Sequence, residues 1–276
     1  MKSILITGCS SGIGYDAVKT LKERGWRVFA TCRQEKDCER LRSEGFESFL
    51  LDYEDEQSIK NAVAEVKTRT GGTLDALFNN GAYAIPGVVE DVPRAAFRAI
   101  YEANVFGYFD LIQQVLPMMR EQGHGRIINC SSVLGFVGLP ARSPYISTKF
   151  ALEGLTDVLR LEHKRIKSPI EIILIQPGPI TTDIRQNSAK QFEKWIDWEN
   201  SPHRKVYEKA IIPRLYAENT GPDWGELGPE AVTKKLIHAL EAKRPRERYM
   251  VTKVTYLMAA LKRLLPVRVL DKILQG

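Results

Sequence analysis

The stretch Lys2-Ser-Ile-Leu-Ile-Thr-Gly-Cys-Ser-Ser-Gly-Ile-Gly14 decides the fold of this chain. Residues 2–7 form a short apolar run, which is typical of a buried strand. After it, Gly8 would permit a tight turn, Gly12 would let the backbone approach a pyrophosphate, and Gly14 would let a helix pack closely on the sheet. The positive end of that helix favours an anion. The residues expected to hold a nucleotide phosphate are Gly8, Ser10, Ser11, Gly12, Ile13 and Gly14.

Comparable apolar runs alternate with helical patterns along the rest of the chain. Strands are expected at residues 2–7, 27–31, 47–51, 74–78, 126–130, 170–175 and 248–251, and long helices at 94–121, with a bend near Pro117, and at 144–166. Short continuous apolar strands are typical of a parallel sheet that has helices on both faces. The alternation therefore predicts an α/β fold with a doubly wound parallel sheet, built as one domain over residues 1–251.

Composition disfavours several other classes of protein. The chain has 276 residues, of which 43% are apolar, so it can bury a sizeable core, and its net charge of +6 does not favour nucleic-acid binding. Its four cysteines, Cys9, Cys32, Cys38 and Cys130, show neither metal-ligand nor disulfide spacing. Free thiols fit a reducing cytosol, and the sequence shows no signal peptide and no long apolar run. We therefore expect a cytoplasmic protein without a metal site.

A tyrosine and a lysine four residues apart are the strongest chemical signal. This spacing occurs three times, at Tyr15/Lys19, Tyr145/Lys149 and Tyr249/Lys253. Only the second copy has a serine pair, Ser131 and Ser132, at the end of a strand before it and a Pro-Gly turn after the next strand. Tyr145 and Lys149 lie one helical turn apart and face the same way. Because a nearby ammonium favours phenolate, it would lower the tyrosine pKa from its usual value of about 10.

The motifs occur in a characteristic order: Thr7–Gly14, Asp52, Asn79-Asn80, Asn104, Ser132, Tyr145 with Lys149, and Pro177-Gly178. In this order they resemble the short-chain dehydrogenase/reductase family over residues 2–251, and residues 145–154 look closest to its hydroxysteroid and retinol dehydrogenase branch. One departure is Asn79-Asn80-Gly81-Ala82, where the family usually has Asn-Asn-Ala-Gly. Both exchanged residues are small, so the backbone should still approach the cofactor ribose.

The resemblance implies a role for each site residue. Tyr145 would exchange a proton with the substrate, Ser132 would polarise the substrate carbonyl, and Lys149 would hold the nicotinamide ribose. Asn104 would kink its helix and hold a water against the lysine. The implied cofactor contacts are Asp52, Asn79, Gly81, Tyr145, Lys149, Pro177, Gly178, Ile180 and Thr182.

The end of the second strand, Ala30-Thr31-Cys32-Arg33, favours NADP(H). An NAD enzyme places an acid here to bind the ribose 2′-hydroxyl, whereas the guanidinium of Arg33 suits a 2′-phosphate. We therefore expect an NADP(H)-dependent oxidoreductase that interconverts an alcohol and an aldehyde or ketone. An NAD-dependent alcohol or hydroxysteroid dehydrogenase and a non-catalytic nucleotide-sensing protein are the alternatives.

Two regions are expected to lie outside the shared core. Residues 183–228 are rich in aromatic side chains, and the resemblance implies a lid over an apolar substrate, with Ser132, Tyr145, Tyr83, Leu139, Pro179 and Phe192 in the pocket. Residues 252–276 form an amphipathic, basic tail that Pro266 should split into two short helices. The tail would pack on the domain or a partner subunit, or lie on an anionic membrane surface. In much of the family the long helices at the positions of Asn104 and Tyr145 form a four-helix interface, so the resemblance implies a homodimer.

Overall fold

Seven parallel strands form one sheet in the computed structural model, which describes residues 1–217 and 222–275. The strand order is β3-β2-β1-β4-β5-β6-β7, so the chain crosses from one half of the sheet to the other after β3, and β4 pairs with β1. The strands are β1 (Ser3–Thr7), β2 (Arg27–Cys32), β3 (Glu47–Leu50), β4 (Ala76–Asn79), β5 (Gly125–Cys130), β6 (Ile170–Gln176) and β7 (Arg248–Met250). Every predicted strand is present, and the doubly wound fold is confirmed.

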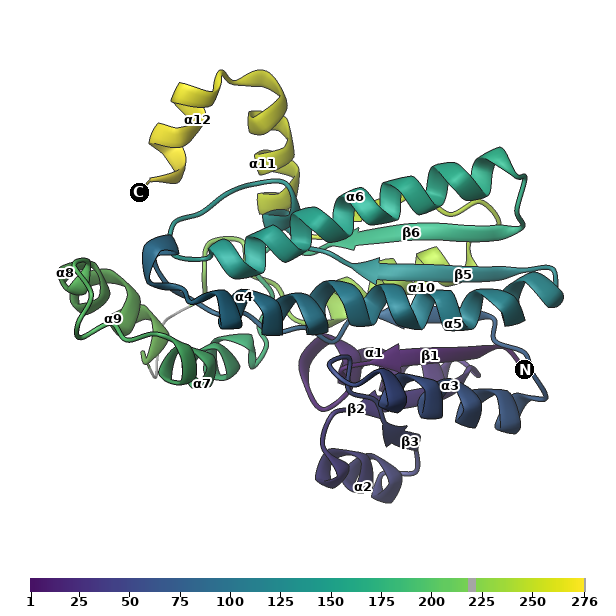
Figure 1. The fold of residues 1–276 in the computed structure, drawn as a ribbon. Helices are drawn as coiled ribbons and strands as arrows, with labels where there is room; N and C mark the ends of the chain where they lie inside the picture. The colour runs from purple at the N-terminus through teal and green to yellow at the C-terminus, as the bar shows by residue number, and fades with distance from the viewer. Residues whose placement is uncertain (218–221, 276) are drawn as a thin grey trace.

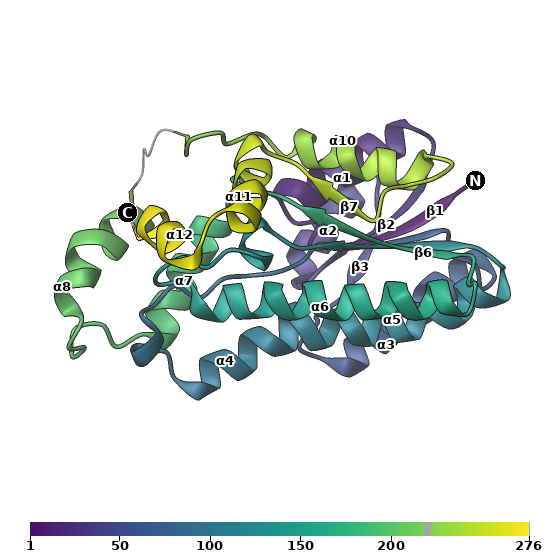
Figure 2. The ribbon, with the colours of Figure 1, turned by 90° about the horizontal axis from the view of Figure 1, so that it is seen from above.

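Helices cover both faces of the sheet (Figures 1 and 2). One face packs against α1 (Gly12–Glu23), α2 (Glu35–Ser43) and α10 (Glu230–Glu241), and the other against α3 (Glu56–Thr70), α5 (Gly107–Glu121) and α6 (Ser143–Arg165). Successive side chains of β1 serve opposite faces, because Ile4 and Ile6 belong to the first core and Leu5 to the second. Both faces are thus buried, as the continuous apolar strands predict.

The long helix expected at residues 94–121 is interrupted, but not at the proline. The structure divides it into α4 (Arg94–Tyr101), a π-helical turn η2 (Glu102–Phe106) and α5, and Pro117 lies inside α5. Asn104 sits in the π turn, where its amide bonds the backbone of Tyr83 instead of pointing to solvent. The interruption therefore lies at Asn104, where the resemblance implies a kink and where a tertiary contact holds the side chain, and α5 continues through Pro117.

The lid region lies beyond the carboxyl ends of the strands and is largely helical (Figure 1). It contains α7 (Ile184–Trp195), α8 (Arg204–Val206), the π turn η4 (Tyr207–Ile211) and α9 (Ile212–Leu215). Its core joins Phe192 and Tyr207 to Ile85 and to Ile100 of α4. The Tyr207 hydroxyl donates to Asp91 (2.7 Å), in the short turn η1 (Val89–Asp91), and so ties the lid to the body.

The tail forms two helices, α11 (Lys253–Leu264) and α12 (Val267–Leu274), which confirms the predicted break at Pro266. Thr252 caps α11, and Lys262 bonds the carbonyl of Phe136, which directly follows the short turn η3 (Val133–Gly135). No residue of α12 is buried. None of the helices in the described residues is both long and apolar enough to cross a membrane. Docking of the tail on a membrane surface stays a prediction.

The end of α6 has an unusual residue in a left-handed conformation. Ser168 N–H donates to His163 O (2.9 Å) and Lys167 N–H to Lys164 O (3.2 Å), the bonding pattern of a Schellman motif. Lys167 has φ +53°, whereas the corresponding position after α3 is Gly71, with φ +67°. A side chain in this region costs about 1–2 kcal/mol.

Replacing Lys167 by Gly is therefore expected to raise the free energy of unfolding. The relief of about 1–2 kcal/mol exceeds the extra unfolded-state entropy of glycine, about 0.4–1 kcal/mol, so a net gain of about 0.5–1 kcal/mol should appear in urea unfolding. The control Lys167→Ala keeps a Cβ atom and should bring no comparable gain. Equal effects of the two substitutions would contradict this interpretation.

Candidate active site

The loop between β1 and α1 is shaped by three glycines that cannot carry side chains. A Cβ atom would lie 2.5 Å from Gly81 Cα if added to Gly8, 2.9 Å from Thr182 Cγ2 if added to Gly12, and 2.2 Å from Gly8 O if added to Gly14. Gly8 and Gly12 also have φ values of +67° and +55°. The side chain of Ser11 does not cap α1, so the first N–H groups of that helix lack a side-chain acceptor. This donor set suits the pyrophosphate of a dinucleotide.

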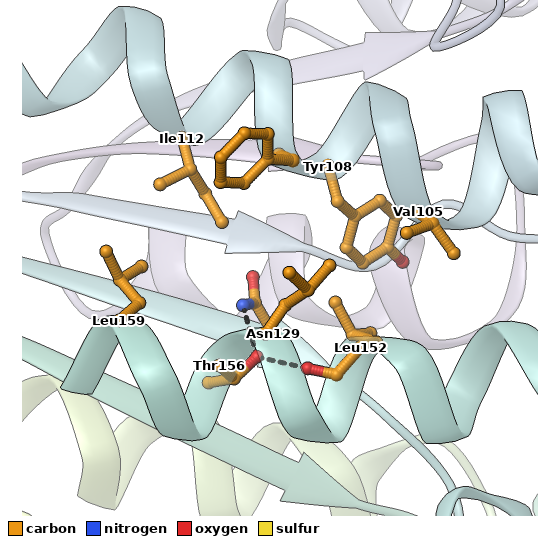
Figure 3. Close-up of a pocket in the computed structure, with 9 residues that line it drawn as sticks. Val105, Tyr108, Ile112, Asn129, Leu152, Thr156 and Leu159 are labelled. Atoms are coloured by element: carbon orange, nitrogen blue, oxygen red, sulfur yellow. Dashed lines mark hydrogen bonds between the residues drawn. The ribbon is translucent and has the colours of Figure 1, made fainter. Parts of the chain in front are cut away.

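A chain of buried polar side chains runs behind this loop, and we call Thr7, Tyr53, Asn79, Asn129 and Thr156 the polar chain. Thr7 Oγ1 lies 2.8 Å from Tyr53 Oη, which donates to Asn79 Oδ1 (2.7 Å). Asn79 Nδ2 donates to Asn129 Oδ1 (2.9 Å), and Asn129 Nδ2 to Thr156 Oγ1 (3.0 Å), a bond visible in Figure 3. The polar chain joins β1, β4, β5 and α6 at one edge of the sheet.

The exchanged pair Gly81-Ala82 follows β4 and lies beside Thr7, at the same carboxyl end of the sheet. Thr7 Oγ1 accepts hydrogen bonds from the N–H groups of Asn80 (2.9 Å) and Gly81 (3.1 Å), which fixes the backbone after β4. A Cβ atom on Gly81 would lie 3.2 Å from Gly8 N, whereas Ala82 is exposed. Here the smaller residue of the pair therefore occupies the tighter position.

The four residues expected to act in catalysis come from β5, η2 and α6. Ser132 is the second residue after the end of β5 and follows Ser131. Tyr145 and Lys149 both lie on α6. Lys149 is buried, donates to Cys130 O (2.7 Å), and places Nζ 5.6 Å from the centre of the Tyr145 ring. Asn104 Nδ2 donates to Tyr83 O (2.9 Å) and Thr148 Oγ1 (3.2 Å), so it links α6 to the loop after β4.

Burial shifts the pKa values of the tyrosine and the lysine in opposite directions. It raises the pKa of Tyr145, and it lowers the pKa of Lys149 to about 8 although Glu153 acts in the opposite sense. The groups that act to lower the Tyr145 pKa are the Ser132 hydroxyl and then the Arg142 guanidinium. The expected lowering by Lys149 is thus not what the structure shows. At neutral pH the phenol is protonated and suited to donate a proton.

The turn after β6 approaches the glycine loop from the other side. Val133 N–H donates to Pro177 O (2.7 Å), and a Cβ atom on Gly178 would lie 2.1 Å from Thr252 Oγ1. Thr182 packs against Gly12, as described above, and Ile180 forms a bridge to Leu227. The structure thus brings the predicted nicotinamide-side residues to the same edge as the phosphate loop.

The expected ribose-side residues are also near one another. Arg33 is exposed after β2, and its charge lowers the pKa of Glu54, which burial and then Asp52 raise. Asp52 Oδ1 accepts from Glu54 N–H (3.0 Å) and so begins the turn into α3. The site therefore contains a second acid, Glu54, which the sequence did not single out.

The expected substrate residues are not all placed around one pocket. Phe192 is buried in the lid core, 5.8 Å from the ring centre of Tyr207, and Tyr83 lies on the cofactor side, where burial and then Glu54 raise its pKa. Leu139 and Pro179 remain partly exposed in loops. Sequence reasoning missed Tyr53, which carries no local signal, and Arg142, whose signal is its position three residues before Tyr145.

Known proteins match this arrangement along the whole chain. The family model described as short chain dehydrogenase matches residues 2–193. Two uncharacterized oxidoreductases are similar: YbbO of Escherichia coli (strain K12) is 41% identical over 100% of this chain and 94% of its own length, and YusZ of Bacillus subtilis (strain 168) is 35% identical over 99% and 97%.

More distant matches agree on the family. Retinol dehydrogenase 7 of Mus musculus is 32% identical over 90% of this chain and 79% of its own length, a lower identity than that of the two bacterial oxidoreductases. The crystal structure of a short-chain dehydrogenase from Streptomyces avermitilis superimposes with a TM-score of 0.77 and 26% identity, over 99% of this chain and 93% of that one. Together with the site geometry, these matches show that the chain belongs to the short-chain dehydrogenase/reductase family of oxidoreductases.

Proposed function

We propose that this protein uses NADP(H) to interconvert an alcohol and an aldehyde or ketone. The observation that supports it most is the surroundings of the Tyr145 phenol: Nζ of buried Lys149, on the same helix, lies 5.6 Å from its ring centre, and the Ser132 hydroxyl acts to lower its pKa. These groups lie at the sheet edge where the phosphate loop and the Pro177–Thr182 turn meet. A nucleotide-sensing protein would need neither the phenol nor the buried ammonium, so the geometry favours an enzyme.

Each site residue has a distinct role in the proposed reduction of a carbonyl. The dinucleotide, held by the glycine loop and the Pro177–Thr182 turn, would supply the hydride. Ser132 hydrogen-bonds and polarises the substrate carbonyl, and Tyr145 gives its proton to the developing alkoxide. Lys149 stays mostly protonated below its pKa of about 8 and so remains available as a donor to the ribose hydroxyls. Asn104 fixes the loop after β4 relative to α6.

Replacing Tyr145 by Phe should abolish most turnover, because it removes the phenolic proton and leaves the glycine loop unchanged. We expect kcat to fall by about 10²–10⁴-fold, the usual contribution of a general acid, while NADPH still binds. Turnover is followed by NADPH absorbance and binding by calorimetry. Tyr15→Phe, from another copy of the Tyr-x-x-x-Lys spacing, is the matched control and should retain activity. Near-normal turnover of the Tyr145 variant would refute the mechanism.

Cofactor choice depends on the balance between Arg33 and the acids near it. The guanidinium after β2 would attract a 2′-phosphate, whereas Glu54 and Asp52 on the neighbouring turn would weaken that attraction. Because Arg33 is exposed and directly follows β2, the position of the ribose-binding acid in NAD enzymes, we favour NADP(H). An NAD-dependent alcohol dehydrogenase remains the second candidate, supported by the same two acids.

Arg33→Asp should move the preference from NADPH toward NADH. Loss of a charge-assisted contact weakens NADPH binding by about tenfold to hundredfold, as about 1.5–3 kcal/mol implies. The measurement is kcat/KM for each cofactor with one substrate. Arg33→Gln removes the attraction without adding repulsion, so its effect should be smaller. A wild-type protein that already prefers NADH would overturn the assignment.

We also propose a homodimer formed through α5 and α6. These neighbouring helices expose Phe109 (42%), Phe150 (41%), Val158 (54%) and Leu161 (61%), and the groove between them is lined mostly by apolar side chains (Figure 3). So large an apolar face on two packed helices is typical of a subunit interface.

Val158→Arg is expected to convert the dimer into a monomer, since it places a charge in an apolar interface. Light scattering after size exclusion at micromolar concentration measures the mass. Val89→Arg is the matched control, because Val89 is similarly exposed (60%) but belongs to η1 and not to α5 or α6. If the wild-type protein is already monomeric, the dimer proposal fails.

A further inference from the structure

Within the part of the chain that the structure describes, Arg142 has no hydrogen-bond or ion-pair partner, and it lies near the candidate proton donor Tyr145. It directly precedes α6, three residues before Tyr145, and its side chain is half-buried. Its guanidinium makes no hydrogen bond and no ion pair with any residue in the two described ranges, 1–217 and 222–275. A partly desolvated charge without a counter-ion destabilises the fold, so its position needs another explanation.

The backbone before Arg142 is held in a strained conformation. Ala141 has φ +56°, a left-handed value that costs a residue with a side chain about 1–2 kcal/mol. Its carbonyl accepts from Gly87 N–H (2.9 Å), and Gly87 and Arg142 form a bridge. Strain of this kind concentrates at functional sites, where surrounding contacts enforce it. Here the hydrogen bond and the bridge to Gly87 fix the backbone at Ala141 and therefore the position of the Arg142 Cα atom.

The charges around Arg142 come from the lid and are mainly positive. Burial lowers the pKa of Arg142, and Arg214 of α9 and Arg185 of α7 lower it further, while Asp223 and Tyr145 raise it. Asp223 is already shared, because it lies 3.1 Å from an Arg214 nitrogen and 3.7 Å from one of Arg185. Among residues 1–217 and 222–275, the charged groups that act on Arg142 are thus two guanidinium groups and one carboxylate, which both of them already contact. Arg185 also lowers the pKa of Glu226, which accepts a hydrogen bond from the Thr181 hydroxyl (2.6 Å).

We propose that Arg142 binds a carboxylate on the substrate. This rests on the proposed function, in which the carbonyl is reduced at Tyr145. The substrate would then be an oxo acid: its carbonyl meets Ser132 and Tyr145, its carboxylate pairs with Arg142, and its apolar chain packs on the lid cluster that Tyr145 also contacts. Arg142 is thus a specificity residue, distinct from the groups that move the proton.

The kinetic test compares ω-oxo acids of about four to ten carbons with their methyl esters, which have nearly the same length but no charge. For the best chain length, the wild-type protein should reduce the acid with a kcat/KM at least about tenfold above that of the ester, the usual effect of a charge-assisted bond. Arg142→Met should lower this acid-to-ester ratio by about tenfold to hundredfold, and Arg142→Lys should lower it less. If Arg142 acted only on the Tyr145 pKa, its replacement would lower kcat/KM equally for the acid and the ester. The acid-to-ester ratio would then stay unchanged, which would overturn the proposal.

A binding measurement keeps the test independent of turnover. Calorimetry with octanoate and 1-octanol should show tighter binding of octanoate to the wild-type protein and loss of that difference in Arg142→Met, with thermal unfolding as the check that the variant is folded. If no carbonyl compound is reduced but octanoate binding depends on Arg142, the proposed reaction fails and the anion site stands. Equal binding of the acid and the alcohol to the wild-type protein would remove the anion site.

Discussion

Buried polar groups must satisfy one another at the carboxyl edge of this sheet, and the rest of the site depends on that constraint. An unpaired buried amide or hydroxyl costs about 1–3 kcal/mol, so the side chains from Thr7 to Thr156 have little freedom to rearrange. Because each of them belongs to a different segment, their mutual bonding sets the spacing between the phosphate loop and α6. That spacing in turn sets the distance between a bound dinucleotide and Tyr145.

Burial supplies most of the electrostatics of the site. It keeps Tyr145 protonated, and it lowers the pKa of Lys149, so that its ammonium holds its proton less strongly than that of a surface lysine. Both groups therefore depend on a few local partners. For the lysine the partner is the carbonyl of Cys130, and for the tyrosine it is the Ser132 hydroxyl. The phenol and Arg142 also act on each other, which makes the charge of the substrate part of the catalytic environment.

The sequence predicts the features that local pattern determines. Apolar runs locate all seven strands, glycine spacing locates the phosphate loop, and Pro266 locates the break in the tail. Contacts between distant residues leave no such pattern. Tyr53 meets Asn79 across 26 residues, and the arginines around Arg142 come from lid helices without clear periodicity. The π turn shows both sides: the resemblance implies a kink at Asn104, but the bonds of Asn104 to Tyr83 join distant residues and could not be predicted from the sequence.

The start of the tail closes the back of the turn after β6. Thr252 occupies the space that a side chain on Gly178 would need, and Lys262 holds the segment that follows Ser132. Consequently, α11 belongs to the catalytic scaffold, whereas α12, which buries nothing, does not. The cofactor-side turn thus depends on residues that follow the last strand of the sheet, and the structural unit of the site extends through α11 to the break at Pro266.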